Sequence, residues 1–374
     1  MSNQIETKGA PLFSGSYAPE DVIFLLKNLN GLIQETELHE RERMIQSGGH
    51  YSEMLPVEYQ PDEAYLNLFH QTLELSANKV ALAVGKVSEL ILKQKGNSLV
   101  LVSLARAGTP MGILIKRYLH KFYGLNLPHY SISIIRDKGI DENAILYIKK
   151  NYPEAKIQFI DGWTGKGVIT KVLTQACQSF YDRYNIELDD DLAVLADPGY
   201  CVTTFGTRED FLIPSACLNS TVSGLVSRTV CREDLIGGQE YHGVKYYTEL
   251  AEYDLSRYFV DTITHRFDAV FAEAKLQAAV HQNSDITATW KGLADIESIR
   301  QEFHIEDVNM IKPGVGETTR VLLRRVPWKI LVNKKENPNL RHILLLAQNK
   351  GVPVEEHREL TYSCCGIVKE LKEI

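Results

Sequence analysis

The chain has 374 residues, of which 44% are hydrophobic and 24% are charged, and this composition excludes a mainly disordered, collagen-like or coiled-coil protein. Its net charge of −7 is unevenly divided, because the residues from Ile311 onward carry +5 and the remainder −12. No apolar run approaches the ~18 residues of a spanning helix, and the first residues lack a secretory pattern. We therefore expect a cytoplasmic protein without membrane contact.

The middle of the chain alternates between helical and strand patterns. A helical pattern over residues 64–95 precedes an apolar strand-like run at 98–103, and Pro110 then begins an amphipathic helix that ends at Tyr123. Further strands are expected at 131–135, 157–161 and 192–196, with helices at 141–152 and 168–184. Continuous apolar strands separated by helices are typical of a doubly wound, mostly parallel α/β sheet that is covered on both faces.

Less regular segments flank this alternating unit. The first 75 residues form an N-terminal extension in which we expect a helix that begins near Pro19 and carries Ile23 on its apolar side. Residues 200–245 are irregular and rich in small hydroxylated side chains, and a long helix is expected over 250–281. This whole part, residues 1–290, is predicted to be one domain.

A smaller α/β/α unit follows the polar stretch 283–291, and we place this second domain at 295–374. Its expected elements are a strand at 308–311, helices at 318–325 and 339–350, a strand at 328–333 and a strand from Val354. Six basic residues and no acidic one lie between Arg320 and Lys335. Such a run indicates either contact with a polyanion or a solvated helix face.

Two loops at carboxyl ends of predicted strands carry candidate ligand-binding residues. Each leads into a helix N-terminus, where free backbone N–H groups bind anions and glycine allows a close approach. Asp161, at a strand end, could accept from sugar hydroxyls or hold Mg²⁺ indirectly through them. The candidates are Arg106, Ala107, Gly108 and Thr109 in the first loop, and Asp161, Thr164, Gly165, Lys166 and Gly167 in the second. The pair of loops predicts a ligand with phosphates at both ends.

Residues 102–112 and 159–167 resemble the pyrophosphate loop and the signature loop of type I phosphoribosyltransferases, over roughly residues 80–230. The resemblance implies phosphoribosyl pyrophosphate or a nucleotide-like ligand, with Mg²⁺ neutralising the leaving pyrophosphate. The resemblance also implies that Asp161, Arg106 and Lys166 are catalytic and that the other loop residues bind substrate. Gly162 stands where that family has a second acid.

The segment from Gly314 to Arg320 resembles the Gly-x-Asn-Glu-x-Thr-Lys loop of the ribosomal-protein-like RNA-binding fold also found in pelota. In that fold the loop and the helix start bind looped RNA through its shape and its splayed bases. The resemblance implies RNA contacts by Gly316, Glu317, Thr319, Arg320, Arg324 and Arg325. Gly316 replaces the expected asparagine, which removes one hydrogen-bonding side chain.

The order of the two units, together with residues 15–22 and 50–56, resembles a bacterial family associated with tellurite-resistance and stress genes. That family pairs a phosphoribosyltransferase-like domain with a pelota-type RNA-binding domain and is also labelled cysteine protease StiP. We predict a phosphoribosyltransferase-like enzyme coupled to RNA binding, and we leave open a homo-oligomer.

Two alternatives remain, a cysteine protease and a non-catalytic nucleotide- and RNA-binding stress protein. A protease needs a thiolate beside a histidine. Cys201 and Cys231 lie in the irregular region, with His242 and His265 as candidate bases, but no local signature joins them. None of the six cysteines forms a CxxC pair or has zinc-finger spacing, so reduced thiols are expected.

Overall fold

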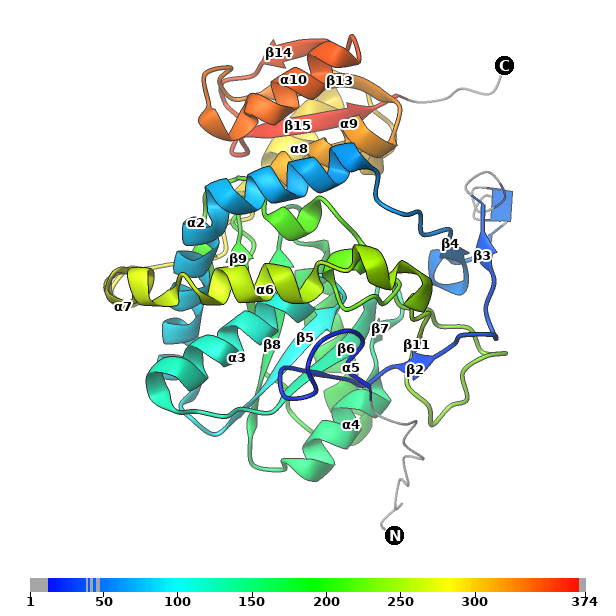
Figure 1. Cartoon of the computed structure of the whole chain (residues 1–374), viewed down its shortest axis with the longest axis vertical. Coiled ribbons are helices and arrows are strands. Elements are labelled where there is room, and N and C mark those ends of the chain that lie inside the picture. The colour runs from blue at the N-terminus through cyan, green and yellow to red at the C-terminus, as the bar shows by residue number, and fades with distance from the viewer. Residues whose placement is uncertain (1–12, 38–39, 41–42, 45–47, 370–374) are drawn as a thin grey trace.

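A computed structural model describes residues 13–37, 40, 43–44 and 48–369. We call the part up to α7 the body and residues 290–369 the C-terminal unit, which lies at one end of the body (Figure 1). The helices are α2 (Glu63–Lys95), α3 (Thr109–Tyr123), α4 (Glu142–Asn151), α5 (Val168–Tyr184), α6 (Ser256–Thr264), α7 (Phe267–Gln282), α8 (Lys291–Glu302), α9 (Val315–Arg324) and α10 (Arg341–Asn349). Short 3₁₀ helices are η1 (Tyr51–Glu53), η2 (Pro214–Ala216), η3 (Ser220–Val222), η4 (Thr248–Tyr253), η5 (Val308–Met310) and η6 (Pro338–Leu340).

The body is built on one mostly parallel sheet, as the alternating pattern predicts. Its strands follow the order β1-β6-β5-β8-β9-β10, all parallel, and β7 pairs antiparallel with β6. These strands are β1 (Ile23–Phe24), β5 (Leu99–Ala105), β6 (His129–Ile135), β7 (Gly139–Ile140), β8 (Lys156–Trp163), β9 (Leu192–Ala196) and β10 (Phe205–Thr207). Two small parallel pairs lie beside it, β2 (Lys27–Asn28) with β11 (Gly243–Val244), and β3 (Glu35–Thr36) with β4 (Leu55–Pro56).

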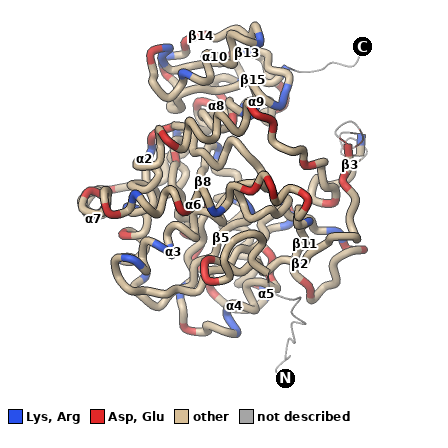
Figure 2. Tube along the Cα trace, viewed as in Figure 1, with Lys and Arg blue, Asp and Glu red and all other residues tan. Residues whose placement is uncertain are grey.

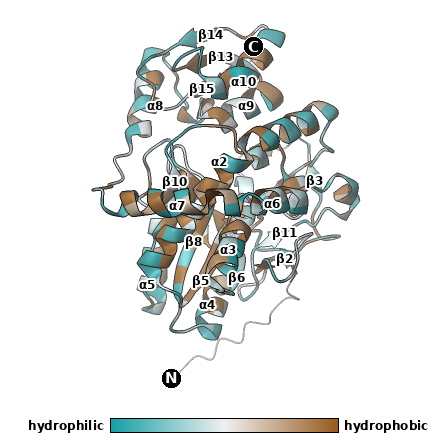
Figure 3. Ribbon diagram, turned by 60° about the vertical axis from the view of Figure 1, so that its left-hand side comes forward, coloured by the Kyte–Doolittle hydropathy of each residue, from teal (hydrophilic) through white to brown (hydrophobic). Residues whose placement is uncertain are grey.

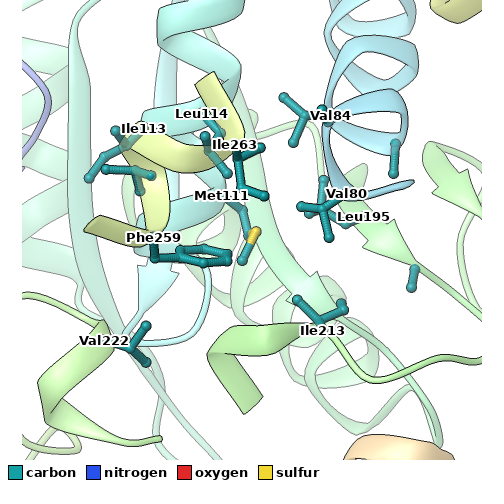
Figure 4. Close-up of a cluster of buried hydrophobic side chains, with 14 of the residues drawn as sticks. Val80, Val84, Met111, Ile113, Leu114, Leu195, Ile213, Val222, Phe259 and Ile263 are labelled. Carbon is teal, nitrogen blue, oxygen red and sulfur yellow. The ribbon is translucent and has the colours of Figure 1, made fainter. Parts of the chain in front are cut away.

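Apolar side chains cover both faces of this sheet. Along β5, Leu99 and Leu101 belong to one core cluster, and Val100 and Val102 belong to another. The first cluster contains side chains of α2, α3, α6 and α7, and the second contains side chains of α4 and α5. Figure 3 shows the apolar strands β5 and β8 between α5 and α3, and Figure 4 shows residues of the first cluster. The sheet is therefore the middle layer of three.

The helix ends follow local signals in the sequence. Asp62 caps α2 by accepting from the backbone N–H of Tyr65 at 2.9 Å, and Gly96 ends the helix with a φ of 77°. Pro110 lies in the first turn of α3, and Asp141 caps α4 by accepting from the N–H of Ala144. These local signals explain why the predicted positions of the helices are close to the observed ones.

The C-terminal unit has a four-stranded sheet in the order β12-β15-β13-β14, with β13 and β14 parallel and the other pairs antiparallel. Its strands are β12 (Ile311–Pro313), β13 (Pro327–Val332), β14 (Val354–Glu356) and β15 (Cys364–Val368). Val315 and Leu322 of α9 belong to the same apolar cluster as Ile213 of the body. Asp210 of the body accepts from the N–H groups of Val315 at 2.9 Å and Ser363 at 2.8 Å.

Three sequence predictions are wrong. Instead of a helix near Pro19, the chain forms β1, which pairs with β6 through Ile23 and Tyr130. The long helix expected over 250–281 is divided into η4, α6 and α7. The strand expected at 308–311 begins only at Ile311, after η5. The pairing of β1 is a contact between distant parts of the chain, which a local pattern does not reveal.

Candidate functional site

The first predicted ligand loop is divided between a cavity and the core. Arg106 and Ala107 line a cavity of about 220 Å³ together with Asp161. Gly108 packs so closely on the next strand that a Cβ would lie 2.4 Å from the carbonyl oxygen of Ile160. Thr109 is buried, and its hydroxyl lies 2.8 Å from the hydroxyl of Ser131. Only part of this loop therefore faces the cavity.

Asp161 lies at the end of β8 in mostly apolar surroundings. Met111, Trp163 and Phe211 also line the cavity, and the carboxylate accepts from the N–H of Gly162 at 2.7 Å. Burial raises the pKa of Asp161 to about 7, although the hydrogen bond from Gly162 opposes this. Burial therefore favours the neutral form of this carboxyl more than water does.

The second predicted ligand loop is covered by the C-terminal unit. The hydroxyl of Tyr362 donates to the carbonyl oxygen of Gly165 at 2.9 Å, and a Cβ on Gly167 would lie 2.2 Å from the ring of Trp290. Lys166 donates to the carbonyl oxygens of Val308 and Ile311, both at 3.2 Å. Thr164 is buried and donates its backbone N–H to Ala196 at 3.1 Å. Gly165, Lys166 and Gly167 are therefore engaged in contacts between the two parts of the chain, whereas Thr164 is bonded within the body.

The residues predicted to contact RNA lie mainly at the boundary between the C-terminal unit and the body. Gly316, Glu317 and Arg320 line the same cavity as Asp161. Arg324 and Arg325 line an adjacent cavity of about 660 Å³. Arg324 also lies over the ring of Tyr65, 5.0 Å from its centre. Thr319 instead is buried, with its hydroxyl 2.7 Å from the carbonyl oxygen of Val315 and 3.0 Å from a ring nitrogen of His342.

A loop in the irregular region brings a cysteine and a histidine together. Val230 and Gly243 exchange two backbone hydrogen bonds of 2.8 Å, so the next residues inward, Cys231 and His242, face each other. Their side chains interact electrostatically, each favouring the charged form of the other. Cys231 is only partly buried, and its backbone N–H donates to the carbonyl oxygen of Ser52 at 3.0 Å.

The surroundings of this pair favour its charged form. The hydrogen bond from His242 and the nearby positive charge of Lys138 lower the pKa of the Cys231 thiol, against the effect of burial. Burial would lower the pKa of His242, but the hydrogen bond to Cys231 and the charge of Asp141 outweigh it, so that this pKa is raised. A thiolate beside an imidazolium is the activated form of a cysteine nucleophile.

The imidazole of His242 is fixed by groups from neighbouring elements. Its Nδ1 lies 2.9 Å from the hydroxyl of Ser133 on β6. The carboxylate of Asp141 accepts from the backbone N–H of His242 at 2.6 Å. Lys138, in the turn between β6 and β7, donates to the carbonyl oxygen of Cys231 at 2.9 Å. The pair is therefore held against the end of the sheet.

The other five cysteines are buried, and burial raises the pKa of each thiol. The pKa of Cys201, the second cysteine that the sequence singled out, rises to about 12, because burial and the negative charge of Asp197 both disfavour the thiolate. The remaining four are Cys177, Cys217, Cys364 and Cys365. His265, the other candidate base, is exposed at the end of α6.

Comparison with known proteins identifies the family. Residues 15–264 match the model of the tellurite-like stress resistance cysteine protease StiP. The chain belongs to the StiP family. It is 35% identical over 359 residues to the cysteine protease StiP of Acinetobacter baylyi, a match that covers 92% of this chain and 90% of that relative. Residues 290–370 match the PELOTA RNA binding domain.

These matches correct the main functional prediction. The family model and the relative are both named as cysteine proteases, so the prediction of a phosphoribosyltransferase is wrong and the protease alternative is favoured. The StiP family and the pelota domain are confirmed, as is the mostly parallel sheet. The transferase roles given to Asp161, Arg106 and Lys166 have no support from the matched family.

The two predicted ligand loops offer one carboxylate, that of Asp161, as a donor for Mg²⁺. Within the described residues, no three His, Cys, Asp or Glu side chains gather in a way that could hold a metal ion. Asp161 has no second acid beside it, because Gly162 follows it, so the donor set does not fit a resident magnesium ion. In the part of the chain that the structure describes, no helix is long and apolar enough to cross a membrane.

Proposed function

We propose that this StiP-family chain is a cysteine protease in which Cys231 is the nucleophile and His242 is the general acid and base. The observation that carries the proposal is the Cys231–His242 pair, in which a partly exposed thiol has a lowered pKa, while the other five cysteines have raised ones. The shared family name supports the reaction class. The assignment of these two residues is our own.

The reaction follows from the charges of the pair. The Cys231 thiolate attacks the carbonyl carbon of a peptide bond, and the resulting tetrahedral intermediate collapses as the C–N bond breaks. The imidazolium of His242 gives its proton to the leaving amine. His242 then takes a proton from water, whose oxygen attacks the thioester and releases the new carboxylic acid and the Cys231 thiolate, so that the starting ion pair is restored. No oxidant, reductant or cofactor takes part.

Three neighbours position this pair. Ser133 fixes the ring of His242, Asp141 holds the backbone at His242 and favours the protonated ring, and Lys138 fixes the backbone at Cys231. None of the three is proposed to touch the scissile bond. They hold the two residues in place while substrate binds.

The test compares Cys231→Ser with Cys177→Ala, a control that removes a buried thiol from α5. Fluorescently labelled casein serves as the probe substrate, and folding is checked by circular dichroism. We expect Cys231→Ser to lose at least about 100-fold in cleavage rate and the control to keep wild-type activity. Undiminished cleavage by Cys231→Ser would refute the assignment.

A second function, RNA binding, is favoured by the match of residues 290–370 to an RNA-binding domain. We propose that the C-terminal unit binds RNA through Arg320, Arg324 and Arg325, with Gly316 and Glu317 at the start of α9. Thr319 is left out of the contact set because it is buried. Binding of a labelled oligouridylate strand to the full chain tests this function, and failure to bind at low salt would contradict it.

A further inference from the structure

Three cavities between the body and the C-terminal unit meet at the same two side chains. Arg106, at the end of β5, and Arg320, on α9, line all three, whose volumes are about 660, 220 and 580 Å³. Arg106 belongs to the body and Arg320 to the C-terminal unit. We call these three cavities, which share Arg106 and Arg320, the interdomain cleft.

The interdomain cleft is richer in positive charge than the chain as a whole. Its described lining contains seven Lys or Arg side chains and four Asp or Glu side chains, in a protein of net charge −7. Elsewhere, both signs are mixed along the body and the C-terminal unit (Figure 2). In the cavity of about 580 Å³, the charged lining side chains are all arginines, namely Arg106, Arg136, Arg228 and Arg320.

The acidic groups of the cleft are partly engaged by protein groups. Glu58 accepts from the backbone N–H and the hydroxyl of Ser220 at 3.1 and 3.0 Å, and its other oxygen lies 3.7 Å from Arg106. Glu317 lies 3.4 Å from Arg320. The Nε of Arg320 is buried without a hydrogen-bond partner among the described residues. A buried donor of this kind is costly unless a ligand accepts from it.

Aromatic rings also line the cleft. Tyr59 lies in the wall of the cavity of about 660 Å³ with 69% of its surface exposed, and Tyr65 lines the same cavity. Proteins that bind single-stranded nucleic acid combine arginines for the phosphates with exposed aromatic rings on which bases stack. An acidic peptide would use the arginines but would leave the exposed ring of Tyr59 without a function.

We propose that single-stranded RNA binds in the interdomain cleft, held by arginines of the body as well as by those of the C-terminal unit. Arg106 and Arg228 contact phosphates from one side, Arg320 and Arg325 contact them from the other, and Tyr59 stacks on a base. The inference rests on the proposed RNA-binding function and adds that half of the site comes from the protease-like body. One end of the cleft, the cavity of about 580 Å³, is lined by Thr229, two residues before Cys231, and by Tyr51, the neighbour of Ser52, whose carbonyl oxygen accepts from the N–H of Cys231.

The experiment measures the fluorescence anisotropy of a labelled oligouridylate strand with the full chain over a range of salt concentrations. Arg228→Met tests the body and Arg325→Met tests the C-terminal unit. The matched controls are Arg183→Met on α5 and Arg300→Met on α8, two exposed arginines outside the cleft. We expect each cleft variant to weaken binding at least about 5-fold and to reduce the slope of log K against log salt by about 0.7. The controls should keep wild-type affinity.

The possible failures are distinguishable. If the wild-type chain binds no RNA, the proposed RNA-binding function itself fails. If Arg325→Met weakens binding while Arg228→Met does not, RNA binds only to the C-terminal unit and the cleft proposal is overturned. Should Arg228→Met fold poorly, Tyr59→Ala decides, because this exposed ring can be removed safely and its loss should also weaken binding at least about 5-fold. Displacement of the RNA by polyglutamate at equal charge concentration would indicate an acidic peptide site instead.

Discussion

Replacing Asp161 with asparagine should stabilise the protein at neutral pH and leave it unchanged in acid. The pKa of Asp161 in the folded chain is about 7, against 3.8 for an ordinary aspartate. A carboxyl whose pKa is raised on folding adds to the free energy of unfolding while it is protonated in the native state. For Asp161 this contribution is complete below about pH 4 and is lost as the pH rises through 7. The difference is about three pKa units, and at about 1.4 kcal/mol per unit the upper bound is about 4 kcal/mol.

Urea unfolding between pH 4 and 8 measures this effect. Asp161→Asn keeps an oxygen that can accept from Gly162, so the variant removes the titration and preserves the hydrogen bond. We expect the free energy of unfolding of the variant, relative to wild type, to rise with pH by about 1–4 kcal/mol. Asp182→Asn, an exposed site on α5, is the control and should show no such rise. A stability difference that does not change with pH, or that shrinks as the pH rises, would refute the reasoning.

Three further predictions concern the other contacts. His242→Gln should shift the pH dependence of the rate at which iodoacetamide alkylates Cys231 to higher pH, because the group that lowers the thiol pKa is lost. An unchanged rate–pH profile would contradict this. Asp210→Ala leaves two buried backbone N–H groups of the C-terminal unit without an acceptor. We expect it to lower the free energy of unfolding by about 3 kcal/mol in urea titrations. A loss below about 1 kcal/mol would show that water replaces the carboxylate. Tyr362→Phe removes the hydrogen bond to the carbonyl oxygen of Gly165 and should cost about 1 kcal/mol in the same assay, and a neutral effect would argue against this contact.

Elements with local signals could be predicted from the sequence. The helix α5, Val168–Tyr184, and the strand β9, Leu192–Ala196, have the predicted bounds, because each is bounded by glycine, asparagine or aspartate residues and has one clear apolar pattern. The edge strand β1 could not be predicted in this way. Its two residues form a strand only because β6, more than 100 residues later, offers backbone groups to pair with.

The two glycine-bearing loops lie at strand ends, as predicted, but the second is covered by the C-terminal unit. The N–H groups at a helix N-terminus can be covered by an anion or by another part of the protein. The sequence of the loop looks the same in both cases. In this chain the cover of Gly165 comes from Tyr362, nearly 200 residues later. The sequence of the loop alone does not contain that information.

The Cys231–His242 pair had a weak signal in the sequence. Gly237 and Gly238 lie near the middle of the segment between the two residues, and a Gly-Gly pair favours a turn that brings flanking residues together. The pairing of Val230 with Gly243 shows that the segment does fold back on itself. The charge state of the thiol, in contrast, depends on Lys138 and Asp141, which come from a different part of the sheet.

The central claim, that Cys231 is the nucleophile, is tested most directly by locating the thiol that reacts first. The full chain is treated at neutral pH with less than one equivalent of iodoacetamide, and mass spectrometry of the digest identifies the alkylated cysteine while casein cleavage is followed in parallel. We expect Cys231 to carry the modification and cleavage to fall in proportion to it. Full cleavage by a chain alkylated at Cys231, or loss of cleavage on modification of a different cysteine, would contradict it.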